Sequence, residues 1–205
     1  KTKFEINATE YDANRHFFMG HHFYGSYDEA LSDLPIIKSS ITIKKVEVWV
    51  TNKSSNFKQS RNILALLDLG ERGQNRQNQT IPEFGDTPGL PYPANTFPNN
   101  ESNMMYQELL NNYSGIRDIS TLSATLKPLS VRDFISGRDY EKIENARRLD
   151  STEYTVNRQL GYISLNSSLN NDEILAIAYQ YTANGQVYQV GEFSTDGIEA
   201  PQTLV

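Results

Sequence analysis

The sequence predicts an α+β domain dominated by antiparallel sheet, sandwich-like, with a few short helices and one long polar loop. β-Branched and apolar residues concentrate at residues 41–50 and 62–69, as they do in strands. Nearer the C-terminus, two alternating stretches flank Asn184 and Gly185, which are a strong hairpin signal because both turn positions need a positive φ. Helical spacing is confined to short segments.

Composition restricts the class of protein. The chain has 205 residues, a net charge of −6 and no cysteine. That length suits one domain, residues 1–205, and the lack of cysteine excludes cysteine-liganded metals and cysteine catalysis. The acidic balance argues against a nucleic-acid partner, and no stretch approaches the ~20 apolar residues of a membrane helix. Because the chain opens on Lys1, we expect a soluble insert of a longer protein.

The N-terminal part holds a predicted strand, an aromatic segment and a short helix. Residues 4–6 can form the strand, and residues 15–27 are dense in Phe and Tyr. Ser26 is placed to cap a helix, with Glu29 three residues later, and Pro35 ends that helix.

Two strands are predicted next. Residues 41–50 place apolar side chains in two phases that change near Lys44, so a β-bulge is expected there. Trp49 then lies on the face opposite the valines. Residues 62–69 are nearly continuously apolar, as in a strand covered on both sides, and the polar residues 51–61 are expected to join the two strands as a long hairpin.

A polar segment follows. Residues 71–103 are rich in Gln, Asn and Gly and hold five of the eight prolines. Such a composition buries little apolar surface, so we expect a flexible polar excursion from the domain.

The remaining chain is expected to begin with a helix at residues 104–113 and to continue as sheet. Residues 154–156 and 160–165 are strand-like, and residues 173–182 and 186–193 form the predicted hairpin. This hairpin and the earlier strand pair are expected to be the main β framework.

All three histidines, His16, His21 and His22, lie in one segment. A helical metal site needs ligands three or four residues apart, and these histidines are five, six and one apart. No cysteine or acidic pair completes a site. We expect no metal and no cofactor, and we expect the histidines to flank an aromatic cluster.

No catalytic constellation stands out. Carboxylate pairs occur at Asp133 with Asp139 and at Asp172 with Glu173, but sequence does not show the separation that glycoside hydrolysis needs. There is no Gly-x-Ser-x-Gly elbow and no glycine-rich phosphate loop before a helix. The expectation is a protein that is not an enzyme.

Several long blocks of the chain occur in an order that is known from one family. They are residues 14–18 (NRHFF), 46–52 (VEVWVTN), 61–63 (RNI), 67–70 (LDLG), 137–142 (GRDYEK), 144–149 (ENARRL), 153–155 (EYT), 160–166 (LGYISLN), 171–179 (NDEILAIAY) and 187–194 (VYQVGEFS). This pattern resembles the SprA (Sov) family of giant outer-membrane proteins of the type IX secretion system. The resemblance covers most of the chain outside residues 71–103.

The resemblance implies a part in protein export. Family members are large β-barrels that form the outer-membrane translocon, and in some relatives they are linked to gliding motility. This chain would then be a non-catalytic domain at the cell envelope, associated with the outer membrane through the parent protein. Its partners would be other parts of the translocon, secretion-system subunits or exported cargo. The resemblance supplies no catalytic residues.

The candidate interaction surface is the aromatic segment together with the single tryptophan. Its residues are His16, His21, His22, Phe23, Tyr24 and Trp49. A second reading is a carbohydrate-binding module, in which Trp49, Tyr92 and Tyr162 stack on sugars, although a place in the core is favoured for Trp49 and Tyr162.

Overall fold

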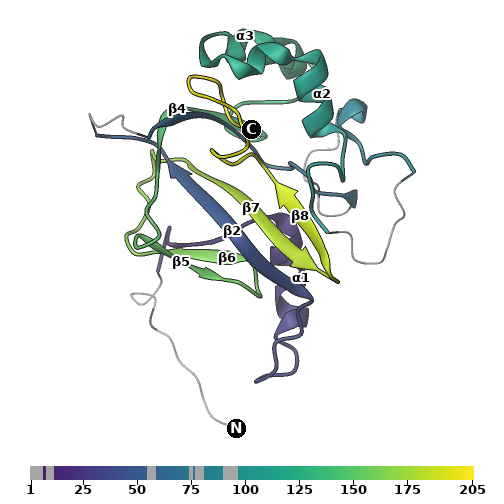
Figure 1. The fold of residues 1–205 in the computed structure, drawn as a ribbon, viewed down its shortest axis with the longest axis vertical. Coiled ribbons are helices and arrows are strands. Elements are labelled where there is room, and N and C mark those ends of the chain that lie inside the picture. Colours follow the sequence, from purple (N-terminus) through teal and green to yellow (C-terminus); the bar gives the residue numbers. More distant parts are fainter. Residues whose placement is uncertain (1–6, 8–11, 55–58, 74–75, 77–80, 90–96) are drawn as a thin grey trace.

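The computed structural model describes residues 7, 12–54, 59–73, 76, 81–89 and 97–205. These described residues form two antiparallel sheets and three short α-helices, which confirms the predicted α+β class. In Figure 1, α2 (Met105–Asn112) and α3 (Ile119–Ser130) lie at one end of the molecule and α1 (His21–Ala30) lies at the other. The strand predicted at residues 4–6 lies outside the described residues.

The larger sheet has five strands in the order β3-β4-β2-β7-β8. Their bounds are β2 Ile41–Val50, β3 Arg61–Leu66, β4 Tyr140–Arg148, β7 Leu175–Ala183 and β8 Gln186–Val190. The register between β2 and β7 shifts between Ile43 and Lys45, which confirms the predicted bulge. β7 and β8 form the predicted hairpin around Asn184 and Gly185, whose φ angles are 51° and 81°.

The predicted hairpin of residues 41–50 with 62–69 is wrong. β4 lies between β2 and β3 and pairs with both. The β4 sequence is rich in Glu, Lys and Arg, and only Ile143 and Ala146 are buried, so its strand signal is weak. The polar linker joins two strands that a third strand keeps apart.

The smaller sheet has the order β1-β6-β5 and packs against the larger one. Its strands are β1 His16–Phe18, β5 Tyr154–Asn157 and β6 Tyr162–Leu165, and the last two match the predicted strands. Phe17, Ile163 and Val156 share the inner face, because side chains alternate along each strand. Ile163 is fully buried in the main core.

The N-cap of helix α1 lies six residues before the predicted cap. The N-cap is Gly20, and Ser26 lies inside the helix, where its hydroxyl donates to the His22 carbonyl at 2.9 Å. His22 and Phe23 are buried, so tertiary packing extends the helix through residues that local capping rules would place outside it. The predicted helix at residues 104–113 is confirmed as α2.

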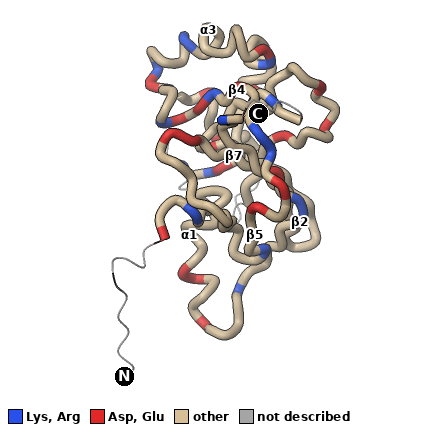
Figure 2. Tube along the Cα trace, turned by 90° about the vertical axis from the view of Figure 1, so that its left-hand side faces the viewer, with Lys and Arg blue, Asp and Glu red and all other residues tan. Residues whose placement is uncertain are grey.

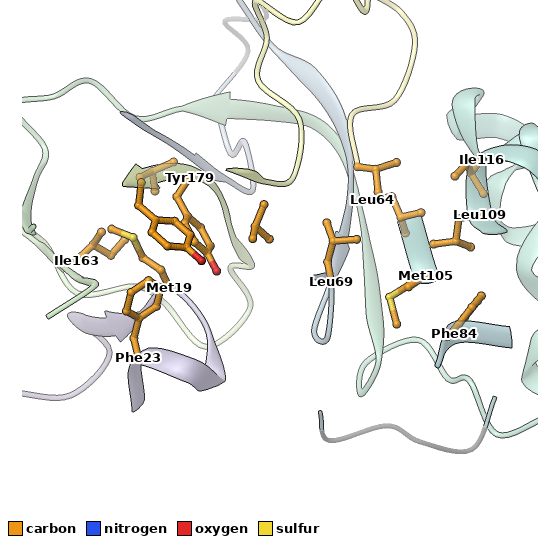
Figure 3. Packing of buried hydrophobic residues seen from close by; sticks show 14 of the residues in the cluster. Met19, Phe23, Leu64, Leu69, Phe84, Met105, Leu109, Ile116, Ile163 and Tyr179 are labelled. Atoms are coloured by element: carbon orange, nitrogen blue, oxygen red, sulfur yellow. The ribbon is translucent and has the colours of Figure 1, made fainter. Parts of the chain in front are cut away.

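The main core runs through the molecule between the two sheets and under α2. Figure 3 shows its two parts: Met19, Phe23, Ile163 and Tyr179 converge on one side, and Met105, Leu109 and Ile116 pack with Leu64 on the other. Trp49 belongs to a second, smaller cluster with Ile63, Ile143 and Leu204, on the opposite face of β2 from Val48, as predicted. The larger sheet therefore has apolar packing on both faces.

Parts of the polar segment 71–103 take part in this packing. Among its described residues, Glu71, Ile81, Phe84 and Asn103 are almost completely buried. The Asn103 side chain donates to the carbonyls of Asp68 and Glu71 at 2.8 and 2.9 Å and so ties the segment to the end of β3. These residues line the core.

The last three residues close the larger sheet. Leu204 forms a parallel bridge with Ile63, and the Val205 carbonyl accepts from the Glu192 amide at 2.7 Å. This C-terminal strap, residues 203–205, thus connects edge strand β3 to the end of β8. Within the described residues, no helix is long and apolar enough to cross a membrane.

A buried ion pair holds the C-terminal strap in place. Arg117 donates to both carboxylate oxygens of Glu192 at 2.6 Å and to the Thr203 carbonyl at 2.9 Å. Tyr106 and the amide of Val205 also donate to this carboxylate, at 2.6 and 2.8 Å. Glu192 is only 3% exposed, and both oxygens of its buried carboxylate therefore accept hydrogen bonds from within the protein.

Candidate functional site

The three histidines lie in separate environments. His16 is exposed on β1, where its ring nitrogens lie 2.8 Å from the Ser164 hydroxyl and 3.3 Å from Asp12. His21 is half-buried, and His22 is buried, which lowers its pKa. No group of three His, Cys, Asp or Glu side chains that could hold a metal ion is found in the described residues.

The two carboxylate pairs are engaged in ion pairs. Asp133 and Asp139 both bind Arg138, and Asp172 and Glu173 both lie within 4.0 Å of the Lys53 ammonium. Hydrogen bonds from Lys53 and from Asn170 lower the pKa of Asp172 and of Glu173, respectively. A general acid needs the opposite shift.

A polar hollow of about 540 Å³ lies between the end of β2 and the loop after β6, with Glu153 and Glu173 in its wall. Arg147 donates to both oxygens of Glu153 and lowers the pKa of that carboxyl. Both carboxylates are thus held in their ionised form, and neither has the raised pKa of a proton donor.

Half of the residues predicted to form the interaction surface are buried. Trp49 is 2% exposed, Phe23 is 1% exposed and His22 is 9% exposed, and all three pack inside the fold. Tyr24, by contrast, is 70% exposed. Tyr92, named in the carbohydrate reading, lies outside the described residues.

An aromatic cluster forms where α1 crosses the small sheet. The Phe18 ring makes edge-on contacts with Tyr24 and Tyr27 of α1, at centroid distances of 5.6 and 5.3 Å, and with Tyr162 of β6 at 6.1 Å. Residues 24 and 27 are three apart and share one side of the helix. Apart from exposed Tyr24, these rings are half-buried and continue the core outward to the surface.

The aromatic cluster lines a surface groove of about 650 Å³. We call this hollow the aromatic groove; its walls are His16, Phe17, Phe18, Tyr24, Gly25, Tyr27, Asp28 and Tyr162. Gly25 has no side chain, so the helix backbone itself forms part of one wall. The aromatic groove combines apolar surface with one carboxylate, which is the composition of a recognition site.

Glu71 fixes the orientation of α1 and therefore of the aromatic groove. Its carboxylate meets the first turn of the helix, where the His22 amide donates to Glu71 Oε1 at 3.3 Å. The positive end of the helix dipole favours a carboxylate there. Burial nevertheless dominates and raises the pKa of Glu71 to about 7.

A partly open hollow of about 390 Å³ lies between β3 and β7, and the exposed residues Tyr24 and Leu67 are among its walls. Leu64, Ile177 and Val205 line it, with Glu71 at its border. Its lining is mostly apolar.

Sequence reasoning found the aromatic segment but not the groove. The predicted surface includes His16 and Tyr24 but not Phe18, Tyr27 or Asp28, because neither β1 nor the true start of α1 is evident from the sequence. The i, i+3 spacing of Tyr24 and Tyr27 was the signal that could have placed both rings on one helix face. Glu71 carried no sequence signal, since it lies in the polar segment.

Charges of both signs are interspersed along the described chain (Figure 2). Basic and acidic side chains often pair, as in the bonds of Arg147 to Glu153 and of Arg132 to Glu83. The surface charge of the described chain is therefore divided among local pairs.

The chain was compared with known protein families. The model of the SprA_N family, described as a motility related/secretion protein, matches residues 1–173. These residues include β1, α1 and all of the aromatic groove. No curated protein matches the chain.

Proposed function

The chain belongs to the SprA_N family of motility related/secretion proteins, and we propose that it is a non-catalytic docking domain of a SprA-like outer-membrane protein of the type IX secretion system. In this role it works at the cell envelope and supports protein export. In cells that glide, it also supports gliding motility. Its contacts are with the parent translocon, secretion-system subunits or cargo.

The observation that carries this proposal is the aromatic groove. Tyr24 keeps 70% of its surface exposed while its ring edge contacts Phe18. Tyrosine supplies large contact area at low entropic cost, and aromatic residues are enriched where proteins bind one another. The aromatic groove lies within the part of the chain that matches the family.

Replacing groove side chains in the full-length parent protein tests the proposal. We expect Tyr24→Ser combined with Asp28→Asn to reduce export of type IX cargo, at unchanged level of the parent protein in the outer membrane. Val131→Ser is the matched control, because Val131 is 89% exposed and lies at the C-cap of α3, outside the aromatic groove. Normal export in the groove variant would contradict the docking role.

A carbohydrate-binding module is the second candidate. Sugar binding by stacking favours open, parallel ring faces, whereas Phe18 and Tyr162 stand at 76° to each other and Tyr27 and Tyr162 stand at 67°. This geometry supports protein docking over sugar stacking. A glycan array probed with the chain distinguishes the two, since reproducible hits lost in Tyr24→Ser would favour the carbohydrate reading.

A further inference from the structure

Strand β1 is an edge strand with one open side. β1 pairs only with β6 in the described structure. The Leu165 amide donates to the Arg15 carbonyl at 2.8 Å, and the Met19 amide donates to the Gly161 carbonyl at 2.9 Å. Because antiparallel hydrogen bonds alternate, Phe17 faces β6 between these two bonds.

The same alternation fixes what the other side of β1 presents. The main-chain N–H and C=O groups of His16 and Phe18 point away from β6. No strand of the described chain pairs with them. Unpaired edge groups of this kind are a template for one more strand.

The aromatic groove lies beside this open edge, since β1 forms part of its floor. All three β1 residues line it, although Phe17 faces the side of the sheet opposite to His16 and Phe18. Tyr162 of β6 also lines it, so the aromatic groove covers the outer face of β1 and β6, and Phe17 borders it through its backbone. The opposite wall is α1, through Tyr24 and Asp28. A groove between an edge strand and a helix fits an extended peptide.

The charge of the aromatic groove selects the kind of peptide. Asp28 is exposed in the wall, and no ion pair to its carboxylate is found in the described part of the chain. Asp12, next to β1, is bound by Arg15 at 2.9 Å and is not available in the same way. A guanidinium can pair with Asp28 and stack on the tyrosines.

We propose that the aromatic groove binds an extended segment of a partner protein, which adds to the open edge of β1 as a fourth strand of the small sheet. The segment alternates basic side chains, which face Tyr24, Tyr27 and Asp28, with apolar side chains, which face Phe17. This inference rests on the proposed docking function and names the partner of the same site.

Amide hydrogen exchange measured by NMR tests the added strand residue by residue. The probe is an acetylated, amidated hexapeptide of alternating arginine and valine, added to the chain at ~1 mM, where even weak complexes form. We expect exchange at His16 and Phe18 to slow at least about twofold, as half-occupancy gives, and exchange at Phe17 to stay constant because its amide is already bonded. A hexapeptide of alternating glutamate and valine should have no effect.

Backbone methylation of the probe separates strand addition from other binding. Methylating alternate amides removes donors from only one edge of the peptide. One methylated set should weaken binding at least tenfold, whereas the other set should bind normally. Equal effects of the two sets, or unchanged exchange at His16 and Phe18, would overturn the proposal.

Side-chain variants test the selectivity. Asp28→Asn should weaken binding of the arginine peptide several-fold, whereas Asp196→Asn, an exposed acid beyond β8, should not. Equal affinity of the Asp28→Asn and Asp196→Asn variants would remove the basic-segment assignment. Loss of export in groove variants together with no peptide binding would leave the docking function standing and reject only this inference.

Discussion

At the scale of single residues, Glu71 links the protonation of one carboxyl to the stability of the fold. Burial raises its pKa to about 7, from the 4.5 that is ordinary for a glutamate side chain. The folded chain therefore binds the proton more tightly than the unfolded chain does. The resulting stabilisation is complete below about pH 4.5 and is lost as the pH rises through about 7.

Glu71→Gln should remove this dependence, because glutamine keeps an acceptor for the His22 amide but has no proton to lose. We expect the difference in unfolding free energy between the native chain and the variant to change by about 3 kcal/mol between pH 4.5 and pH 8. Urea unfolding at a series of pH values measures it. Two parallel pH curves would show that Glu71 is not the group responsible.

Tyr24 and Trp49 were predicted to belong to one surface, but Trp49 is buried and Tyr24 is exposed. Their mutation should therefore change the unfolding free energy by different amounts. Trp49→Ala should lower the unfolding free energy by about 3–5 kcal/mol, because it empties the centre of the second cluster. Tyr24→Ala removes a largely exposed ring and should cost less than about 1 kcal/mol. Urea unfolding of both variants gives the comparison, and similar losses would contradict the assigned burial.

At the scale of elements, the contact between α1 and β6 depends on a glycine. Gly161 has φ +65°, and a Cβ there would lie 2.0 Å from Phe23 Cδ1. Gly161→Ala should therefore destabilise the fold by about 3 kcal/mol or more, through steric overlap added to the left-handed backbone.

Gly185→Ala is the matched control for that variant. Gly185 also has a positive φ, +81°, but no heavy atom lies within 4 Å of its Cβ position. Gly185→Ala should lower the unfolding free energy by about 1 kcal/mol, because only the left-handed backbone conformation is penalised. Thermal unfolding of the two variants measures the contribution of the contact between Phe23 and Gly161. Equal losses of stability in both variants would mean that Phe23 moves aside.

The elements predicted correctly from the sequence are those whose own residues carry a clear periodic pattern or turn signal. Residues 41–50 and the hairpin around Asn184 carry strong periodic or turn signals, and both are strands. β4 hides its two buried residues among charged ones, and β1 is three residues long. Short or charged strands are specified by their neighbours, and neighbours are not visible in a local window.

The candidate site was harder to predict for the same reason. His22 and Phe23 look like surface aromatics in sequence, but α1 turns them into the core. Tyr24 is one residue further along the helix and faces solvent. Which residues of a helix are exposed depends on where the helix begins, and Glu71 sets that start from 49 residues away.

At the scale of the whole molecule, the C-terminal strap depends on the ion pair of Arg117 with Glu192. Glu192→Ala should cost about 3–5 kcal/mol, because it leaves Arg117 and Tyr106 without their shared acceptor. The amides of Leu204 and Val205 should then exchange faster than those of β7. Urea unfolding and hydrogen exchange measure the two effects.

The exposed pair of Lys142 with Glu144 is the control for the strap variant. Its ions lie 2.7 Å apart, but more than half of the Glu144 side chain is open to solvent. Glu144→Ala should change the unfolding free energy by less than about 1 kcal/mol. A loss as large as that of Glu192→Ala would mean that burial does not decide the strength of these pairs.

The C-terminal strap also sets the order in which the chain can fold. The Asn62 side chain donates to the Pro201 carbonyl across 139 positions of sequence, and Leu64 at the edge of β3 bonds to Leu204. Pairings between such distant residues form slowly, because a long loop must close first. Until the C-terminal strap is in place, the edge of β3 that Leu204 covers stays unpaired, and an unpaired strand edge favours association with other chains.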